Sequence, residues 1–376
     1  MSTRLIEVGL ACVLLGGMSF AQSTTPQKPT PDAATPPLSS LTTLSPCTAG
    51  AQAPAPQPEA DDEFRMLAIY QRLTPGDLPA LEECVTADQP EAQFLLGHAL
   101  LEGRLVDRDV NRGLVLLRRS AAQGFRAAEM ALGDRYAAGG LVARDEAEAF
   151  RWYLKAAEHR SVTAQAIVGE MYLAGRGTRR DAADAAQWLS RAGQQGHAAA
   201  QRSLAALYAN GDGVPRDDRE AVAWYMKAAD GGDVVAQVEM GVRYATGHGV
   251  PKSEAMAQQW EELAAAQGSG EALRALGQRF LEGRGVTADN ARAASYFLQA
   301  AEAGDGIGMC ALGDMYASGK GVARSDRDAY RWYMTAVTAG NRKCEPAQRE
   351  AGRRLSKQDR DAAERDARAW MARRSS

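Results

Sequence analysis

The stretch "GDGVPRDDREAVAWYMKAADGGD" at residues 211–233 decides the fold, because its parts recur along the chain. It joins a Gly-x-Gly turn and a Pro to an acidic segment, a Trp-Tyr pair and a second Gly-rich turn. Gly-rich turns occur in phosphate-binding loops, Asp-rich turns occur in calcium loops, and both occur in plain bends between helices. The way in which the stretch changes between its copies distinguishes these three interpretations.

The chain repeats itself every 36 residues, seven times without an insertion. Each copy has a small central residue, a Gly six residues later and a large residue nineteen residues later, in a position that we call the Trp column. The central residues are Gly97, Gly133, Gly169, Ala205, Gly241, Gly277 and Gly313. The Trp column contains Leu116, Trp152, Trp188, Trp224, Trp260, Tyr296 and Trp332. A fixed period of this length is typical of stacked helical hairpins, so the sequence predicts an all-α fold.

Each copy is predicted to form two helices. In the first, apolar residues at a spacing of four make one stripe, as in Ala128, Leu132 and Tyr136. The second begins at an Asp or Ser whose side chain can accept an otherwise unpaired backbone N–H. These residues are Asp109, Asp145, Asp181, Asp217, Ser253, Asp289 and Ser325. The second helix ends in Gly-rich turns suited to left-handed backbone, and its Trp column is predicted to lie in the core.

The middle residue of the Gly-x-Gly turn changes from copy to copy. It is Arg176, Asp212, His248, Arg284 or Lys320. A phosphate or calcium loop would need the same chemistry in each copy. The turn is therefore predicted to be a bend between the two helices.

These columns resemble the SEL-like repeat family, which is related to the tetratricopeptide repeats. The segments "AQVEMGVRYATGHGV" (236–250) and "GDMYASGKGVARSDRDAYRWYMTAV" (313–337) carry nearly the whole pattern. The resemblance implies a right-handed α/α superhelical solenoid of seven 36-residue helix-turn-helix repeats with helical caps. It also implies a scaffold for protein complexes, in bacteria often in the envelope, without a common catalytic residue. The chain departs from the pattern at Leu105, Leu141, Arg160 and Glu261, which predicts local variation in turns and no change of fold.

The regions outside the repeats differ in composition from the repeats. Residues 1–21 read as a signal peptide cleaved after Ala21, with an uncleaved anchor or a lipoprotein as alternatives. Pro, Thr and Ala dominate residues 22–60, which are predicted to be a disordered linker. We predict N-terminal capping helices at 61–88, seven repeats at 89–340 and C-terminal capping helices at 341–376, with Trp370 against the last repeat. The mature chain is predicted to be periplasmic or secreted, without a transmembrane segment.

Four cysteines follow the predicted signal peptide, namely Cys47, Cys84, Cys310 and Cys344. Export implies an oxidising compartment, and the spacing favours the pairs Cys47–Cys84 and Cys310–Cys344 among the three possible pairings. Buried free thiols are the alternative. The absence of a Cys-x-x-Cys motif speaks against a zinc or redox site.

The sequence predicts no catalytic residue, no cofactor and no metal site. Its four His fall at four different repeat positions, so they would not converge on a metal ion. With 44 basic and 47 acidic residues and no long block of one sign, the chain shows no preference for nucleic acid.

The surface that remains is the predicted partner-binding groove. By analogy with tetratricopeptide solenoids, the first helices line the inner curve, and the positions three before and one after the central residue face it. The residues predicted for this groove are Met130, Asp134, Glu170, Arg202, Val238, Arg274 and Gln278. Their mixture of charged and apolar groups suits a polypeptide, and an ordinary solvated surface is the alternative.

The favoured hypothesis is an exported bacterial scaffold that binds a protein or peptide partner of the cell envelope along its concave face. One alternative is a structural protein associated with peptidoglycan or polysaccharide of the cell wall. A hydrolase acting on β-lactams is a weaker alternative, because such SEL-like relatives carry a cysteine pair in each repeat and this chain does not.

Overall fold

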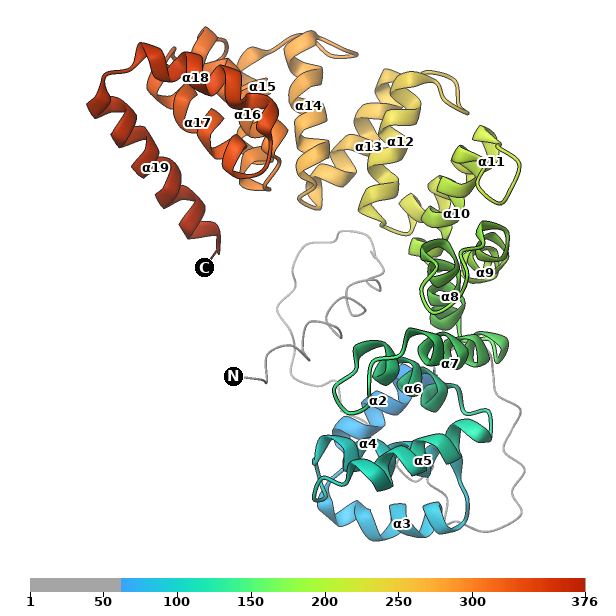
Figure 1. Cartoon of the computed structure of the whole chain (residues 1–376). Coiled ribbons are helices and arrows are strands. Elements are labelled where there is room, and N and C mark those ends of the chain that lie inside the picture. Colours follow the sequence, from blue (N-terminus) through green and yellow to red (C-terminus); the bar gives the residue numbers. More distant parts are fainter. Residues whose placement is uncertain (1–61, 376) are drawn as a thin grey trace, which may run out of the picture. The chain divides into compact units, whose positions relative to one another are not determined.

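A computed structural model describes residues 62–375, and all secondary structure in this range is helical (Figure 1). The predicted signal peptide, the predicted linker and Cys47 lie outside the described residues. Each 36-residue copy forms two helices, and we number these copies repeats 1–7. The first helices are α4 (Pro90–Glu102), α6 (Arg126–Ala138), α8 (Val162–Ala174), α10 (Ala198–Asn210), α12 (Val234–Thr246), α14 (Gly270–Glu282) and α16 (Gly306–Ser318). The second helices are α5 (Val110–Ala122), α7 (Glu146–Glu158), α9 (Ala182–Gln194), α11 (Asp218–Asp230), α13 (Glu254–Ala266), α15 (Asn290–Glu302) and α17 (Asp326–Thr338).

The chain forms a tandem α/α solenoid, as the sequence predicts. In six repeats the first helix packs against the second helix of its own repeat, and in repeat 3 Gly169 of α8 lies against Leu189 of α9. In most repeats the first helix also packs against the second helix of the repeat before it. The chain divides into two compact units. The first unit ends at Val168 and includes Arg176–Thr178, and the second contains Gly169–Gly175 and continues from Arg179.

The second helices begin where the sequence predicts, because all seven capping side chains make the expected hydrogen bonds. In the stretch quoted above, the carboxylate of Asp217 accepts from the backbone N–H groups of Arg219 at 2.9 Å and Glu220 at 3.1 Å. In repeat 5 the hydroxyl of Ser253 accepts from the N–H of Met256 at 3.2 Å. Each such cap typically stabilises a helix by about 1 kcal/mol.

The small central residues allow the two helices of a repeat to approach closely. A Cβ atom added to Gly313 would lie 2.6 Å from Cδ1 of Tyr333, and one added to Gly169 would lie 2.6 Å from Cγ of Leu189. Both distances are too short for non-bonded carbon atoms. The Trp column lies in the core at Trp224, Trp260 and Trp332, as predicted, whereas Trp152 and Trp188 are half-buried under the cationic groups of Lys155 and Arg191.

The Gly-x-Gly turn is a bend that seats one repeat on the repeat before it. Gly211 ends α10 with a left-handed backbone, at φ 76°. A Cβ atom on Gly213 would fall 2.2 Å from the carbonyl carbon of Ala182, in the first turn of α9. Repeats 1 and 2 lack the second glycine, as the sequence shows: Leu105 takes its place in repeat 1 with a φ of 73°, and Leu141 takes it in repeat 2.

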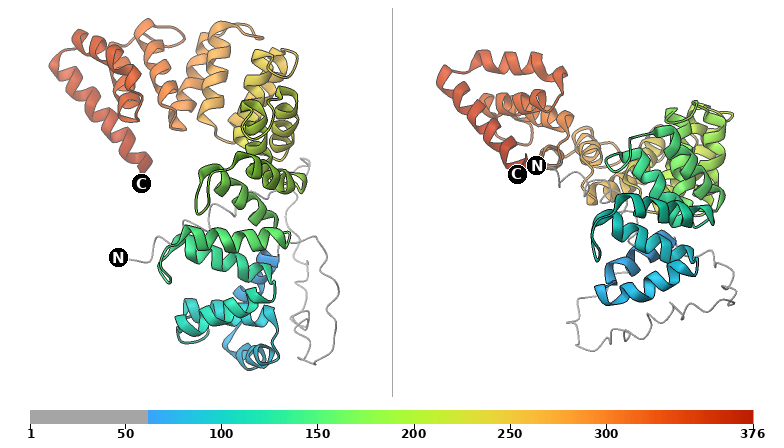
Figure 2. Two further views of the ribbon diagram at one scale, coloured as in Figure 1. Left: turned by 45° about the vertical axis from the view of Figure 1, so that its right-hand side comes forward. Right: turned by 60° about the horizontal axis from the view of Figure 1, so that its bottom comes forward.

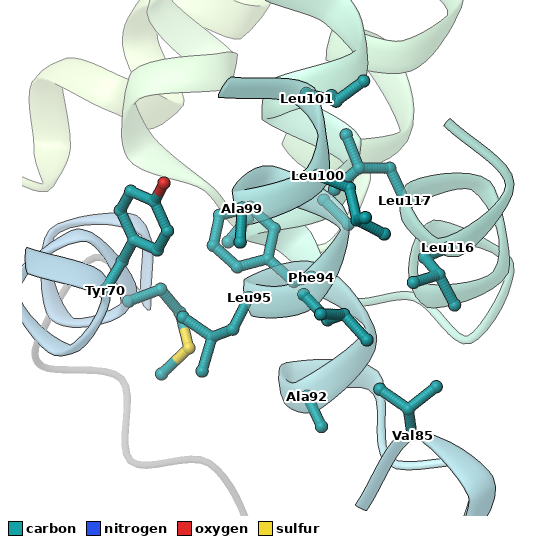
Figure 3. Close-up of a cluster of buried hydrophobic side chains, with 14 of the residues drawn as sticks. Tyr70, Val85, Ala92, Phe94, Leu95, Ala99, Leu100, Leu101, Leu116 and Leu117 are labelled. Carbon is teal, nitrogen blue, oxygen red and sulfur yellow. The ribbon is translucent and has the colours of Figure 1, made fainter. Parts of the chain in front are cut away.

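Helices outside the repeats cover both ends of the array. Before repeat 1 the chain forms α2 (Asp62–Arg72), the 3₁₀ turn η2 (Pro75–Asp77) and α3 (Leu78–Thr86). Figure 3 shows the apolar cluster that these helices share with α4 and α5. After repeat 7 follow η3 (Arg342–Cys344), α18 (Glu345–Arg354) and α19 (Lys357–Ser375), and both α18 and α19 pack on α17 (Figure 2).

Two contacts hold the C-terminal helices in place. The ring of Trp370 meets that of Trp332 edge to face at 5.3 Å between centroids, which confirms the predicted position of Trp370. The predicted disulfide Cys310–Cys344 is present and links α16 to η3, with a Cα–Cα distance of 6.1 Å. A bridge that closes a loop of 34 residues stabilises the fold by about 4 kcal/mol in the chain-entropy account. The pair Cys47–Cys84 stays a prediction, because Cys47 is not described.

Candidate partner-binding surface

The candidate binding surface is the face that the first helices present on the side away from their partner helices, which we call the first-helix face. In the first unit this face is already occupied. Helix α2 packs on α4 and α6 there, with its Met66 and Tyr70 almost fully buried (Figure 1). The ring of Tyr70 meets His98 at 4.7 Å, and its hydroxyl donates to Glu102 at 2.8 Å.

This arrangement corrects one predicted groove residue. Met130 is only 3% exposed, and Phe94, in the equivalent position of repeat 1, is 6% exposed. Neither side chain is therefore accessible to a partner. Both lie on the first helices that α2 packs against. The sequence gives no signal for this cover, because α2 precedes the repeats and follows none of their periodicity. Asp134, also predicted for the groove, is exposed, and its carboxylate accepts from the hydroxyl of Tyr153 at 2.7 Å.

In the second unit the predicted groove residues reach the surface. Glu170 is exposed, and Arg202, Val238, Arg274 and Gln278 are half-buried. Helix α12 presents an apolar stripe on this face, in which Val235 is 56% exposed and Val242 is 48% exposed, with Val238 between them. Exposed aliphatic side chains in a row mark a surface that can bury apolar groups of another molecule.

The two predicted arginines join neighbouring repeats. Nε of Arg202 lies 3.1 Å from Asp233, and Nε of Arg274 lies 3.1 Å from Asp305. The same carboxylates cap α12 and α16 by accepting the backbone N–H groups of Ala236 at 2.8 Å and Gly308 at 2.6 Å. The charges of both arginines are therefore balanced within the chain, and a change at either would weaken a helix cap as well as the surface.

A hollow of about 540 Å³ opens on the first-helix face between α14 and α16. Its walls include the apolar side chains of Leu281, Ala311 and Met315, and Asp314 supplies a carboxylate. The hydroxyl of Tyr333 donates to Oδ1 of Asp314 at 2.7 Å. Burial raises the pKa of Tyr333 and the hydrogen bond to Asp314 raises it further, so the phenol keeps its proton and orients the carboxylate.

A buried ionic cluster joins repeats 5 and 6 beneath this surface. The guanidinium of Arg279 is 1% exposed and binds Glu261 through two hydrogen bonds, at 2.8 Å from Nε and 2.9 Å from Nη2. Its Nη1 donates to Glu254 at 2.7 Å. In the sequence, Glu261 is an exception in the position directly after the Trp column, which is apolar or aromatic in the other repeats. The sequence does not indicate that Arg279 is its partner. The cluster holds the hairpins together and is not open to a ligand.

Within residues 62–375, no group of three or more His, Cys, Asp and Glu side chains is placed to hold a metal ion. No helix in this range is long and apolar enough to cross a membrane. His159 lies beside the buried carboxylate of Glu129, at 2.9 Å, and His197 caps α10, so both have structural contacts.

Comparison with known proteins places these features in one family. The family model described as "Sel1 repeat" matches seven consecutive segments, namely 90–125, 126–161, 162–197, 198–233, 234–269, 270–305 and 306–341. No curated protein matches the chain. Among solved structures, a Sel1 repeat protein from Oxalobacter formigenes is similar at 28% identity and a TM-score of 0.64, over 78% of this chain and 88% of that protein.

Two further solved structures are similar to the chain at lower TM-scores. The protective antigen c5321 of uropathogenic Escherichia coli, described as displaying an SLR fold, has 24% identity and a TM-score of 0.47 over 79% of each chain. Cysteine rich protein B of Helicobacter pylori has 29% identity and a TM-score of 0.29, over 36% of this chain and 96% of that protein.

Proposed function

The chain belongs to the Sel1-repeat family, and from this premise we propose that it is an exported scaffold that binds a protein or peptide partner along the first-helix face of its second unit. Sel1-repeat proteins are typically scaffolds for protein interactions. The observation that carries the proposal is the position of α2, because the chain itself uses the first-helix face of repeats 1 and 2 to hold a polypeptide segment. The corresponding face of α12 leaves Val235 and Val242 exposed.

The seven repeats combine a constant frame with variable surface positions. The capping Asp and Ser residues and the glycines of the turns hold the backbone in the same geometry in repeats 3–7. The position one after the central residue, in contrast, holds Glu170, Val242, Gln278 and Asp314 in different repeats. A constant frame with variable side chains on one face is what a surface for an extended partner requires.

The test is affinity purification of the full chain from the cell envelope of the source organism, with mass spectrometry of bound proteins. Val235→Glu with Val242→Glu places two charges on the apolar stripe and should remove the partner. Leu263→Glu with Leu298→Glu is the matched control, since these side chains are 50% and 39% exposed on the second helices α13 and α15. A partner that stays bound to the stripe variant, or that is lost from both variants, contradicts the assignment of this face.

Export is the second part of the proposal. The disulfide Cys310–Cys344 supports it, because structural disulfides persist in oxidising compartments and are rare in the cytosol. Fractionation of source cells should place the protein in the periplasm or the medium, with a mature N-terminus at Gln22. Recovery of the full-length chain from the cytosol with reduced cysteines contradicts this part of the proposal. No observation in residues 62–375 favours the wall-associated structural protein or the β-lactam hydrolase.

A further inference from the structure

The hollow between α14 and α16 contains a carboxylate whose orientation is fixed by a neighbouring hydroxyl. Asp314 stands one position after the central residue of repeat 7, and its Oδ1 accepts from Tyr333. The other charged side chain that lines the hollow is the exposed Lys320, which forms no ion pair in the described part of the chain. Arg354 and Glu350 of α18 act on Tyr333 from nearby and pair with each other at 2.6 Å. Like Lys320, Asp314 forms no ion pair within the described residues, so its exposed carboxylate is open to a cation from outside the chain.

The position after Asp314 gives the hollow an apolar floor. Repeats 2, 5 and 6 carry an arginine directly after the variable position, namely Arg135, Arg243 and Arg279, whereas repeat 7 carries Met315. Met315 is 2% exposed and belongs to the apolar cluster of repeats 6 and 7. A carboxylate over an apolar floor is less well solvated than one in open water, so a cation that reaches it gains more from the interaction.

We propose that this hollow binds a lysine or arginine side chain of the partner polypeptide, an inference that rests on the proposed function of the first-helix face. The carboxylate of Asp314 accepts the cationic head, and the hydroxyl of Tyr333 fixes the orientation of that carboxylate. The methylene stem packs against Leu281, Ala311 and Met315, as long basic side chains do on apolar surfaces. A volume of about 540 Å³ accommodates such a side chain together with part of its backbone.

The charge of the surrounding face agrees with a basic partner. Glu170 and Asp314 are exposed on the first helices of the second unit without an ion pair in the described part of the chain, whereas Glu271 pairs with Arg274 at 3.4 Å. The two half-buried arginines of the face are already paired with Asp233 and Asp305. The carboxylates of Glu170 and Asp314 favour the approach of a positively charged segment.

The test uses peptides selected from a phage-displayed random library of about twelve residues on the immobilised full chain. Enriched peptides should carry Lys or Arg at one fixed position, and norleucine there should lower the affinity about tenfold in fluorescence anisotropy. Asp314→Asn should also lower the affinity of the Lys peptide about tenfold. It should hardly change the affinity of the norleucine peptide, because the norleucine and the Asn substitutions remove the same interaction. Asp134→Asn is the matched control, since it removes the equivalent carboxylate–tyrosine pair in repeat 2 and should leave the affinity unchanged.

The outcomes separate this inference from the proposed function. Peptides without a basic preference, or peptides that bind Asp314→Asn as tightly as the unchanged chain, overturn the assignment of the hollow. If those same peptides are lost from Val235→Glu with Val242→Glu, the first-helix face remains the binding surface. A library that yields no binding peptide contradicts both. Circular dichroism of Asp314→Asn checks that the fold is intact, as expected for an exposed side chain.

Discussion

The junction between repeats 5 and 6 and the junction between repeats 6 and 7 solve the same packing problem with opposite chemistry. At each junction, one position of the earlier repeat, twenty residues after its central residue, meets one position of the later repeat, two residues after its own central residue. Repeats 5 and 6 place Glu261 against Arg279 there, as a buried ion pair. Repeats 6 and 7 have Phe297 and Met315 at these positions, within one apolar cluster. The backbone therefore sets where repeats touch, and leaves open whether charge or apolar area makes the contact.

A third junction shows a chemistry between these two. Between repeats 4 and 5, the guanidinium of Arg243 lies over the ring of Tyr225, at 4.8 Å from its centroid. A cation over an aromatic face gains about 0.5–2 kcal/mol, depending on how far it is desolvated. Neighbouring repeats thus differ in how much their contact depends on complete pairing of charges, and substitutions should show this difference.

The largest expected effect is at the apolar junction. Phe297 is fully buried and fills the space beside Gly277, so Phe297→Ala should lower the free energy of unfolding by about 3–5 kcal/mol. Urea unfolding followed by circular dichroism measures the change. Leu298→Ala is the control, because the neighbouring side chain is 39% exposed and should matter by about 0.5 kcal/mol or less. If both variants lose a similar free energy of unfolding, the buried position of Phe297 does not stabilise the junction.

The ionic junction should be sensitive to loss of one partner. Glu261→Gln keeps the volume but leaves the buried guanidinium of Arg279 with Glu254 as its remaining anion, which should cost about 2–3 kcal/mol in the same measurement. Glu262→Gln, at the exposed next position, should have an effect within about 0.5 kcal/mol. A loss below about 1 kcal/mol for Glu261→Gln would mean that the buried pair is not a structural requirement.

The same contrast shows what sequence reasoning could and could not predict. The repeats, the seven helix caps and the close approach at Gly313 follow from side chains that act on their own backbone or on their own hairpin, and these predictions are confirmed. The pairing of Arg202 with Asp233 joins side chains 31 residues apart and depends on how two repeats stack. The cover that α2 forms over α4 and α6 depends on tertiary packing alone. From the sequence alone, an arginine that is free on the surface therefore could not be distinguished from one that forms an ion pair between two repeats.

An exchange of chemistry sharpens the comparison further. Glu261→Phe with Arg279→Met installs at repeats 5 and 6 the side chains of repeats 6 and 7. Replacement of a buried ion pair by apolar side chains is often neutral or stabilising, so the double variant should match the unchanged chain or exceed it by about 1–2 kcal/mol. Glu261→Phe alone should be destabilised, because it removes the main partner of a buried guanidinium. If the double variant is no more stable than the single one, the two positions do not act as a pair.

The smallest expected effect is the pH dependence of the ionic junction. The hydrogen bond from Arg279 holds the pKa of Glu254 below its usual value, with a further contribution from Lys252. A carboxyl whose pKa is lower in the folded chain stabilises the fold at pH values above its unfolded pKa, which is about 4.3 for Glu. This stabilisation is lost as the pH falls through the pKa of the folded chain. Glu254→Gln should therefore lower the free energy of unfolding slightly at pH 6, by about 1 kcal/mol or less for a partly exposed pair. The difference from the unchanged chain should shrink toward pH 3, whereas the loss in Phe297→Ala should stay constant, because no charge takes part in that contact. If Glu254→Gln is destabilised by the same amount at pH 6 and at pH 3, its effect comes from packing and not from charge. The ionic chemistry of the junction between repeats 5 and 6 would then not explain why it differs from the apolar junction.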